Sequence, residues 1–138
     1  MMMRNDAVAN GKREAASKKY DIYDRAFRFA ARTAKFLQAV PKSLTITEYQ
    51  KQLIRSSGSI GANLEEADGT LSRKDFVNRV AIARREARES RHWLRLIQET
   101  AVIQDEKTKA ELTALVQESM EILLILSSII RKTQEKDL

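Results

Sequence analysis

The chain has no cysteine, one proline, four glycines and few aromatic residues. Without cysteine it can form neither a disulfide nor a thiolate metal site, which suits a reducing compartment. One proline and four glycines leave little material for the turns of a loop-rich or all-β protein. The most apolar stretch, 120–130, contains Glu121 and is far shorter than the ~20 residues of a membrane span. Residues 1–19 lack the apolar run of a secretory signal, so we expect a cytoplasmic protein with no membrane association.

What the chain does contain is charge and apolar residues in the proportions of an amphipathic helical protein. Of its 138 residues, 43% are apolar and 32% charged, and the net charge is +6. Residues 1–20 contribute five basic and two acidic side chains, or +3, and residues 21–138 contribute the other +3. A basic balance of this size permits binding to nucleic acid. The alternative is a soluble helical protein whose excess of Lys and Arg is incidental.

Apolar periodicity and capping residues divide the chain into four helices. The first is expected over about 22–39, with two adjacent apolar stripes, and ends before Pro41. The second starts at Thr47, whose capping box is completed by Gln50, and reaches residue 68, where Gly69 is expected as a left-handed stop. The third follows Ser72 to about residue 103. The fourth follows Asp105 and covers about 106–132.

The third helix carries the most regular pattern in the sequence. Its apolar and small residues advance by alternating steps of four and three, a heptad seam that predicts a buried face. The seam consists of Phe76, Val80, Ala83, Ala87, Ser90, Leu94 and Ile97. Gly58 and Gly61 in the second helix each cost about 1 kcal/mol relative to Ala, so we expect another backbone to pack closely there. A helix break near Gly58 is the alternative.

Four helices with short connections predict an all-α, antiparallel up-down-up-down four-helix bundle over residues 21–135. Residues 1–20 are expected to be a disordered or frayed basic lead-in. The first and fourth helices carry more apolar residues than a single bundle of this size can bury. We therefore expect the chain to self-associate.

Polar residues fall on positions of the second and third helices that would face each other in such a bundle. We expect them to form a buried polar network that fixes helix register, with a ligand-binding or catalytic role as the alternative. Its members are Arg55, Ser59, Asn63, Glu66, Glu86 and Glu89.

A stripe of arginines on the third helix is the candidate nucleic-acid site. Steps of four, three and four place them on one face, where they could contact successive phosphates. The stripe consists of Arg84, Arg88, Arg91 and Arg95. The alternative is a solvated face with intrahelical ion pairs, such as Arg85 with Glu89. The single tryptophan, Trp93, could stack on a base, but we favour packing against a neighbouring helix.

No residue set suited to catalysis or metal binding stands out. Glu89 and His92 form one Glu-x-x-His pair, but di-metal four-helix proteins need two, and His92 is the only histidine. The segment GSIG at 58–61 lacks the lysine and preceding strand of a phosphate loop. We therefore expect no enzymatic activity, no cofactor and no metal.

The residues RSSGSIGANLEEADG (55–69), SRKDF (72–76) and IARREARESRHWLRLI (82–97) resemble the family of small bacterial four-helix bundle proteins encoded in intervening sequences of 23S rRNA genes. The resemblance covers about 23–132. It departs at His92 and Ser90, where relatives often have Tyr and Thr. It implies a ring-shaped homopentamer. It also implies similarity to the accessory variability determinant of diversity-generating retroelements, the partner of a reverse transcriptase and its RNA.

Together these features predict a non-enzymatic, self-assembling bundle that binds nucleic acid, RNA in particular, through its basic surface. The alternative is a protein-interaction scaffold, akin to a reverse-transcriptase accessory protein, with no direct nucleic-acid role. The partners expected are other copies of the chain, RNA or DNA, and a nucleic-acid enzyme.

Overall fold

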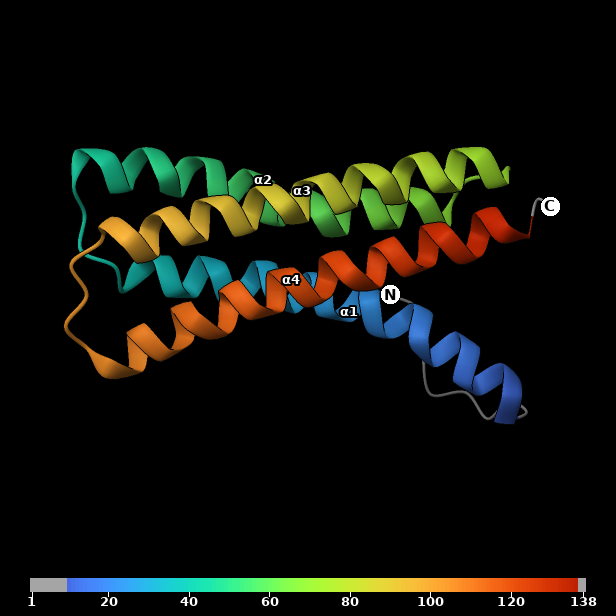
Figure 1. Ribbon diagram of the computed structural model, residues 1–138, viewed down its shortest axis with the longest axis horizontal. Helices are drawn as coiled ribbons and strands as arrows, with labels where there is room; N and C mark the ends of the chain where they lie inside the picture. The colour runs from blue at the N-terminus through green and yellow to red at the C-terminus, as the bar shows by residue number, and fades with distance from the viewer. Residues whose placement is uncertain (1–9, 137–138) are drawn as a thin grey trace.

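The computed structural model describes the backbone of residues 10–136 and the side chains of residues 22–136. The described residues form four helices and no strand: α1 (Asn10–Gln38), α2 (Leu44–Asp68), α3 (Arg73–Thr100) and α4 (Glu106–Glu135). Consecutive helices run in opposite directions along the long axis of the molecule (Figure 1). The prediction of an all-α four-helix bundle is confirmed.

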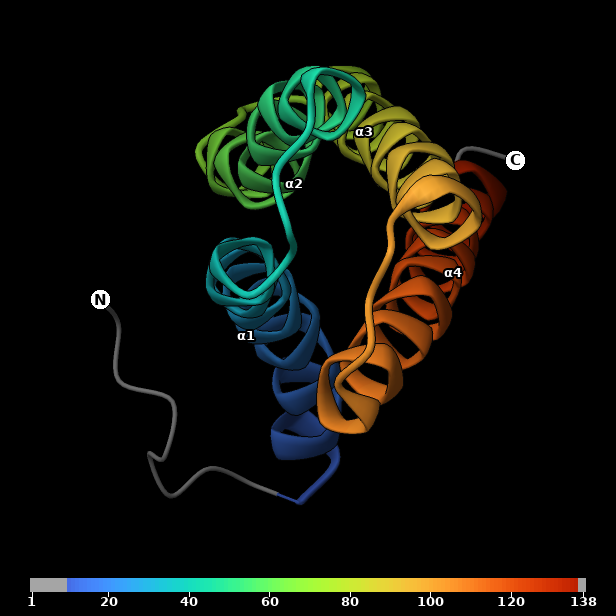
Figure 2. The same ribbon diagram turned by 90° about the vertical axis from the view of Figure 1, so that its left-hand side faces the viewer.

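The helices follow one another around the bundle axis in chain order (Figure 2). Each packs against the next, and α1 closes the bundle against α4. Within the described part of the chain the diagonal pairs, α1 with α3 and α2 with α4, bring no two Cα atoms within 8 Å. The α2–α3 contact is the most extensive and the α1–α4 contact the least. The α1–α2 and α3–α4 interfaces therefore lie on opposite sides of the bundle.

Two of the four predicted N-caps are found, and the N-cap predicted at Asp21 is wrong because Asp21 lies inside α1. The Ser72 hydroxyl accepts a hydrogen bond from the Asp75 N–H at 3.1 Å, and the Asp105 carboxylate accepts one from the Thr108 N–H at 2.9 Å. The capping box at Thr47 is wrong. Ser43 caps α2 by accepting from the Ile46 N–H at 3.1 Å, so the helix begins at Leu44 and Thr47 lies inside it. The first residue with a hydroxyl after Pro41, Ser43, is therefore the N-cap of α2.

The other helix ends also differ from the prediction. Gly69 ends α2, but its φ of −91° is not left-handed, and its N–H donates to the Glu66 carbonyl within a tightened last turn. The third helix ends at Thr100, three residues early. The first begins at Asn10 rather than near Ile22, because residues 12–19 are mostly strong helix formers even without an apolar stripe. Residues 1–9 of the predicted lead-in lie outside the described residues.

The core follows the predicted stripes closely. Every predicted member of the first α1 stripe is buried, as is every member of the α3 seam except Phe76, which is half-buried. On α4 the buried residue near the C-terminal end is Ile130, where Ile129 was expected. The heptad step drifts on a 3.6-residue helix, so the buried face shifts by one position over this length.

Helix α2 is continuous through both glycines, so the break near Gly58 does not occur. The expected close approach is found at neither site. A Cβ at Gly61 would lie 3.9 Å from the Ala26 Cβ, an ordinary contact distance, and a Cβ at Gly58 would have nothing within 4 Å. The glycines instead open a space beside α1.

Part of the predicted apolar excess on the first and fourth helices is at the surface. Phe27 on α1 is 68% exposed and Leu124 on α4 is 57% exposed. By length and composition α4 could cross a membrane, with a mean hydropathy of 1.5 over 18 residues of which 28% are buried. A single helix of this kind is weak evidence, because core helices of soluble bundles have the same property.

Candidate nucleic-acid interface

The four predicted arginines share one flank of α3, and we call Arg84, Arg88, Arg91 and Arg95 the arginine face. It borders α4, because the Arg84 guanidinium donates to the Ser127 hydroxyl at 3.4 Å. Arg88 and Arg95 are exposed, and Arg84 and Arg91 are half-buried. The Nε atom of Arg91 is buried without a hydrogen-bond partner. Among residues 22–136, no carboxylate pairs with any of the four.

Three arginines that join neighbouring helices elsewhere in the bundle, Arg25, Arg32 and Arg55, are paired with carboxylates. Arg25 binds Glu118 at 2.7 Å and Glu121 at 3.0 Å, joining α1 to α4. Two turns along α1 from Arg25, at the same interface, Arg32 binds Glu111 at 3.0 Å. Among the described side chains, the arginine face thus lacks the ion pairs that hold Arg25 and Arg32, and its charge is available to an external anion.

The α4 side of this surface is uncharged and partly apolar. Ser127 defines the flank of α4 that meets Arg84. Met120, two turns earlier, shares that flank, and the exposed Leu124 lies beside it. A phosphate at the arginine face would thus meet cations on α3 and no competing acid on the adjacent flank of α4.

The predicted intrahelical pair between Arg85 and Glu89 is not present. Glu89 instead accepts from Arg55 of α2 at 2.8 Å, and Arg55 also binds Glu86 at 3.3 Å. This part of the predicted network is formed. It is only partly buried, because Glu86 is 8% exposed whereas half of the Arg55 side chain faces solvent.

The rest of the predicted network separates from this cluster. Asn63 donates to the Ser59 carbonyl at 2.9 Å and accepts from Arg79 at 3.3 Å, a partner the sequence analysis did not identify. Glu66 is exposed and takes no part. The single buried network is therefore wrong: Ser59, Asn63 and Glu66 lie about one, two and three turns along α2 from Arg55, and none of the three is buried.

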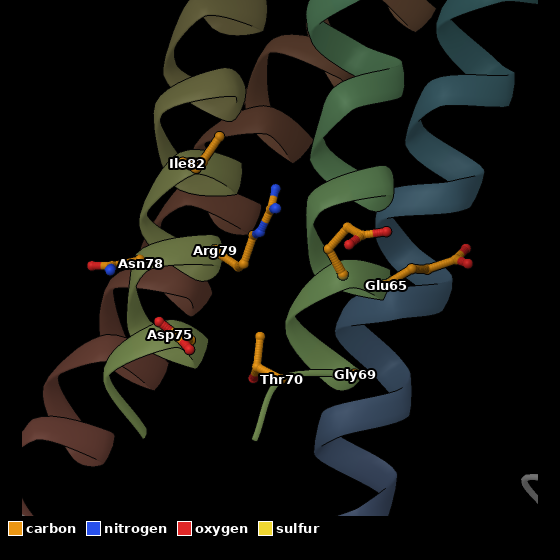
Figure 3. A pocket seen from close by; sticks show the side chains of 8 residues that line it. Glu65, Gly69, Thr70, Asp75, Asn78, Arg79 and Ile82 are labelled. Carbon is orange, nitrogen blue, oxygen red and sulfur yellow. The ribbon is translucent and has the colours of Figure 1, made fainter. Parts of the chain in front are cut away.

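Arg79 lies in a polar pocket of about 540 Å³ between α2 and α3, near the turn that joins them. Figure 3 shows its side chain in the space between the two helices, with Gly69 and Thr70 at the turn below it. Acidic residues Glu65, Glu66 and Asp75 also line this pocket. Its open, mixed-charge lining suits solvent better than a specific ligand.

The ion pairs between α1 and α4 were not anticipated from the sequence. The hydrogen bond to Glu118 raises the pKa of the Arg25 guanidinium, and that to Glu111 raises the pKa of Arg32. The hydrogen bond from Arg25 lowers the pKa of Glu121. The i, i+7 spacing of Arg25 and Arg32, matched by Glu118 and Glu111, was the available signal.

Trp93 is half-buried between α2 and α3, as favoured from the sequence. Its ring lies 5.8 Å from that of Tyr49, and the exposed His92 ring meets it edge-on at 4.9 Å. These contacts agree with packing of Trp93 against the neighbouring helix. In the described part of the chain, no three His, Cys, Asp or Glu side chains gather as metal ligands.

Comparison with known proteins identifies the family of this chain. The family model for the 23S rRNA-intervening sequence protein matches residues 18–125. The chain belongs to the 23S rRNA-intervening sequence protein family. This agrees with the resemblance carried by residues 55–97, and the matched region ends before the last turns of α4.

A crystal structure of a protein of unknown function from the S23 ribosomal protein family of Bacteroides thetaiotaomicron is similar to this family member. The two share 34% identity with a TM-score of 0.66, over 83% of this chain and 98% of the other. No curated protein matches the chain. The comparisons therefore establish family and fold, and the activity has to be argued from the surface.

Proposed function

We propose that this protein is a non-enzymatic nucleic-acid-binding protein that contacts RNA through its arginine face. The observation that carries the proposal is that no carboxylate among residues 22–136 pairs with Arg84, Arg88, Arg91 or Arg95, whereas Arg25, Arg32 and Arg55 are paired. Guanidinium groups bind phosphate through charge-assisted hydrogen bonds. From Arg84 to Arg95 the helix rises about 16 Å, a length that spans several phosphates of one strand.

Self-association forms part of the proposal. The exposed Phe27 and Leu124 are large apolar side chains that a second copy could cover. The family resemblance implies a ring of five. In a closed ring every copy presents its arginine face in an equivalent position, so that the fields of the faces add. We place the assembled protein in the cytoplasm.

The decisive experiment measures RNA binding by a charge-reversal variant of the two exposed arginines. Arg88→Glu with Arg95→Glu should abolish binding to single-stranded RNA at low salt, because each substitution replaces a phosphate contact with repulsion. The control is Lys42→Glu with Lys107→Glu, which makes the same change of charge at exposed sites away from the face. Equal loss in both variants, or retained affinity in the first, would remove the arginine face from the proposal.

A protein-interaction scaffold is the second candidate. The observation that favours it is the exposed Phe27 beside an open groove between α1 and α2, a feature that phosphate binding does not use. The two functions differ in salt dependence. A scaffold without a nucleic-acid role would show no affinity for RNA even at 50 mM salt, where nonspecific electrostatic binding is strong.

A further inference from the structure

A groove runs along the side of the bundle opposite the arginine face, between α1 and α2. It has a volume of about 810 Å³. Its floor is made of residues with little or no side chain, and Phe27 stands at its edge with 68% of its surface exposed. The floor residues are Ala26, Ala30, Gly58, Gly61 and Ala62. Because a Cβ at Gly58 would meet nothing within 4 Å, the groove can accept another helix at close range.

The groove is acidic, and none of its lining residues between 22 and 136 is a cation. Asp24, Glu65 and Glu66 are the only charged residues among those that line it. Asp24 is paired with Arg28 at 2.9 Å. Glu65 and Glu66 are exposed and form no ion pair among residues 22–136. Two unpaired carboxylates above an apolar floor select a ligand that is both basic and able to pack closely.

The first helical turns of this chain have that chemistry. Residues 10–20 (NGKREAASKKY) contain four basic side chains and one acidic, a charge of +3, together with Gly11, Ala15, Ala16 and Ser17. Eleven helical residues are about 16 Å long. The α1 wall of the groove runs from Tyr23 to Ala30, about 12 Å, so the segment is long enough to cover the groove.

This segment cannot enter the groove of its own copy. Helix α1 is continuous from Asn10 to Gln38, so residues 10–20 extend along the helix axis away from Tyr23, where the groove begins (Figure 1). We propose that the basic helical segment 10–20 of one copy docks in the acidic α1–α2 groove of another. The inference rests on the self-association in the proposed function and names the surfaces that make it, leaving the arginine face free for RNA.

Inter-chain disulfide formation tests the contact directly, since the natural chain has no cysteine. Full-length chains carrying Ala16→Cys and a tag are mixed with full-length chains carrying Ala62→Cys on the groove. The expected result is rapid disulfide formation between tagged and untagged chains. Ala15→Cys is used in parallel, because one of two neighbouring positions faces a packed partner. The control partner is Thr113→Cys, an exposed residue of α4. Equal rates with Thr113→Cys and Ala62→Cys would overturn the proposal.

Charge exchange provides a second, independent measurement. Glu65→Lys with Glu66→Lys should lower the solution mass of the full chain toward one copy, and Lys18→Glu with Lys19→Glu in the same chain should restore it. The control is Glu99→Lys with Glu135→Lys, both exposed and outside the groove. A melting curve checks that each variant is folded. An unchanged mass in the Glu65 and Glu66 variant contradicts the proposal.

The two proposals fail in different ways. A chain that stays a single copy at every concentration refutes self-association, and with it this docking. Suppose instead that the chain assembles normally, that no disulfide forms between Ala16→Cys and Ala62→Cys, and that the charge reversals leave the solution mass unchanged. These results refute only the docking. RNA affinity is measured in each case, so loss of the groove contact is not confused with loss of the arginine face.

Discussion

The hydroxyls of Ser56 on α2 and Ser90 on α3 lie 2.9 Å apart and are fully buried. The Ser56 hydroxyl also lies 3.4 Å from the Leu53 carbonyl, to which it can donate, and either serine can be the donor of the bond they share. Small side chains at this crossing allow α2 and α3 to form the most extensive contact in the bundle. The two hydroxyls and the Leu53 carbonyl form a short series of hydrogen bonds buried between α2 and α3.

Removing one member of this pair should destabilise the fold more than removing both. Ser56→Ala leaves the buried Ser90 hydroxyl without its hydrogen-bond partner and should lower the free energy of unfolding by about 1–3 kcal/mol. The double variant with Ser90→Ala leaves no stranded donor, so its loss should be less than the sum of the two single losses. Denaturant unfolding of the four proteins gives the coupling energy. Additive losses would mean that the hydroxyls do not interact.

Removing the hydroxyl of Thr33 on α1 should instead stabilise the fold. Its hydroxyl is buried and has no hydrogen-bond partner, although the residue is fully enclosed. Thr33→Val keeps the shape and removes the unsatisfied group, so the free energy of unfolding should rise by about 1 kcal/mol. Thr113→Val at an exposed site of α4 is the control, with little change expected. A less stable Thr33→Val protein would show that the hydroxyl is satisfied in solution.

Acid should weaken the contact between α1 and α4. The pKa of Glu121 is held below its ordinary 4.5 by the Arg25 hydrogen bond. Its ionised form therefore stabilises the fold above pH 4.5, and this contribution is lost as the pH falls through the lowered pKa. In unfolding curves, Glu121→Gln should be less stable than the natural chain at pH 7, and the difference should shrink toward pH 3. Glu135→Gln, at an exposed terminal position, should show no such convergence.

Periodicity was enough to predict the helices and their buried faces, because burial follows the 3.6-residue repeat of each helix separately. The stripe from Ile22 to Val40 and the seam from Val80 to Ile97 were assigned correctly on this basis. Helix ends were harder, since Ser43 and Thr47 are both good N-caps and the choice depends on where the chain emerges from Pro41.

Pairing between helices could not be predicted in the same way. It depends on the axial register of two helices, which no periodicity within one of them fixes. Arg25 and Glu118 are 93 residues apart, and Asn63 meets Arg79, which was not a member of the predicted network. The arginine face was identified because its members lie on one helix. That no carboxylate among residues 22–136 pairs with these arginines could be established only once the position of α4 was known.

The last prediction concerns the salt dependence of RNA binding, which gives the number of phosphate contacts as well as showing that such contacts exist. For single-stranded nucleic acid, the logarithm of affinity falls with the logarithm of salt concentration by about 0.7 for each phosphate neutralised. Arg88→Gln and Arg95→Gln should each reduce this slope by about 0.7 per copy engaged, and weaken binding equally for all RNA sequences. Lys107→Gln, outside the arginine face, should leave the slope unchanged. If Arg88→Gln alters preference between sequences while the slope stays constant, Arg88 contacts a base and not a phosphate.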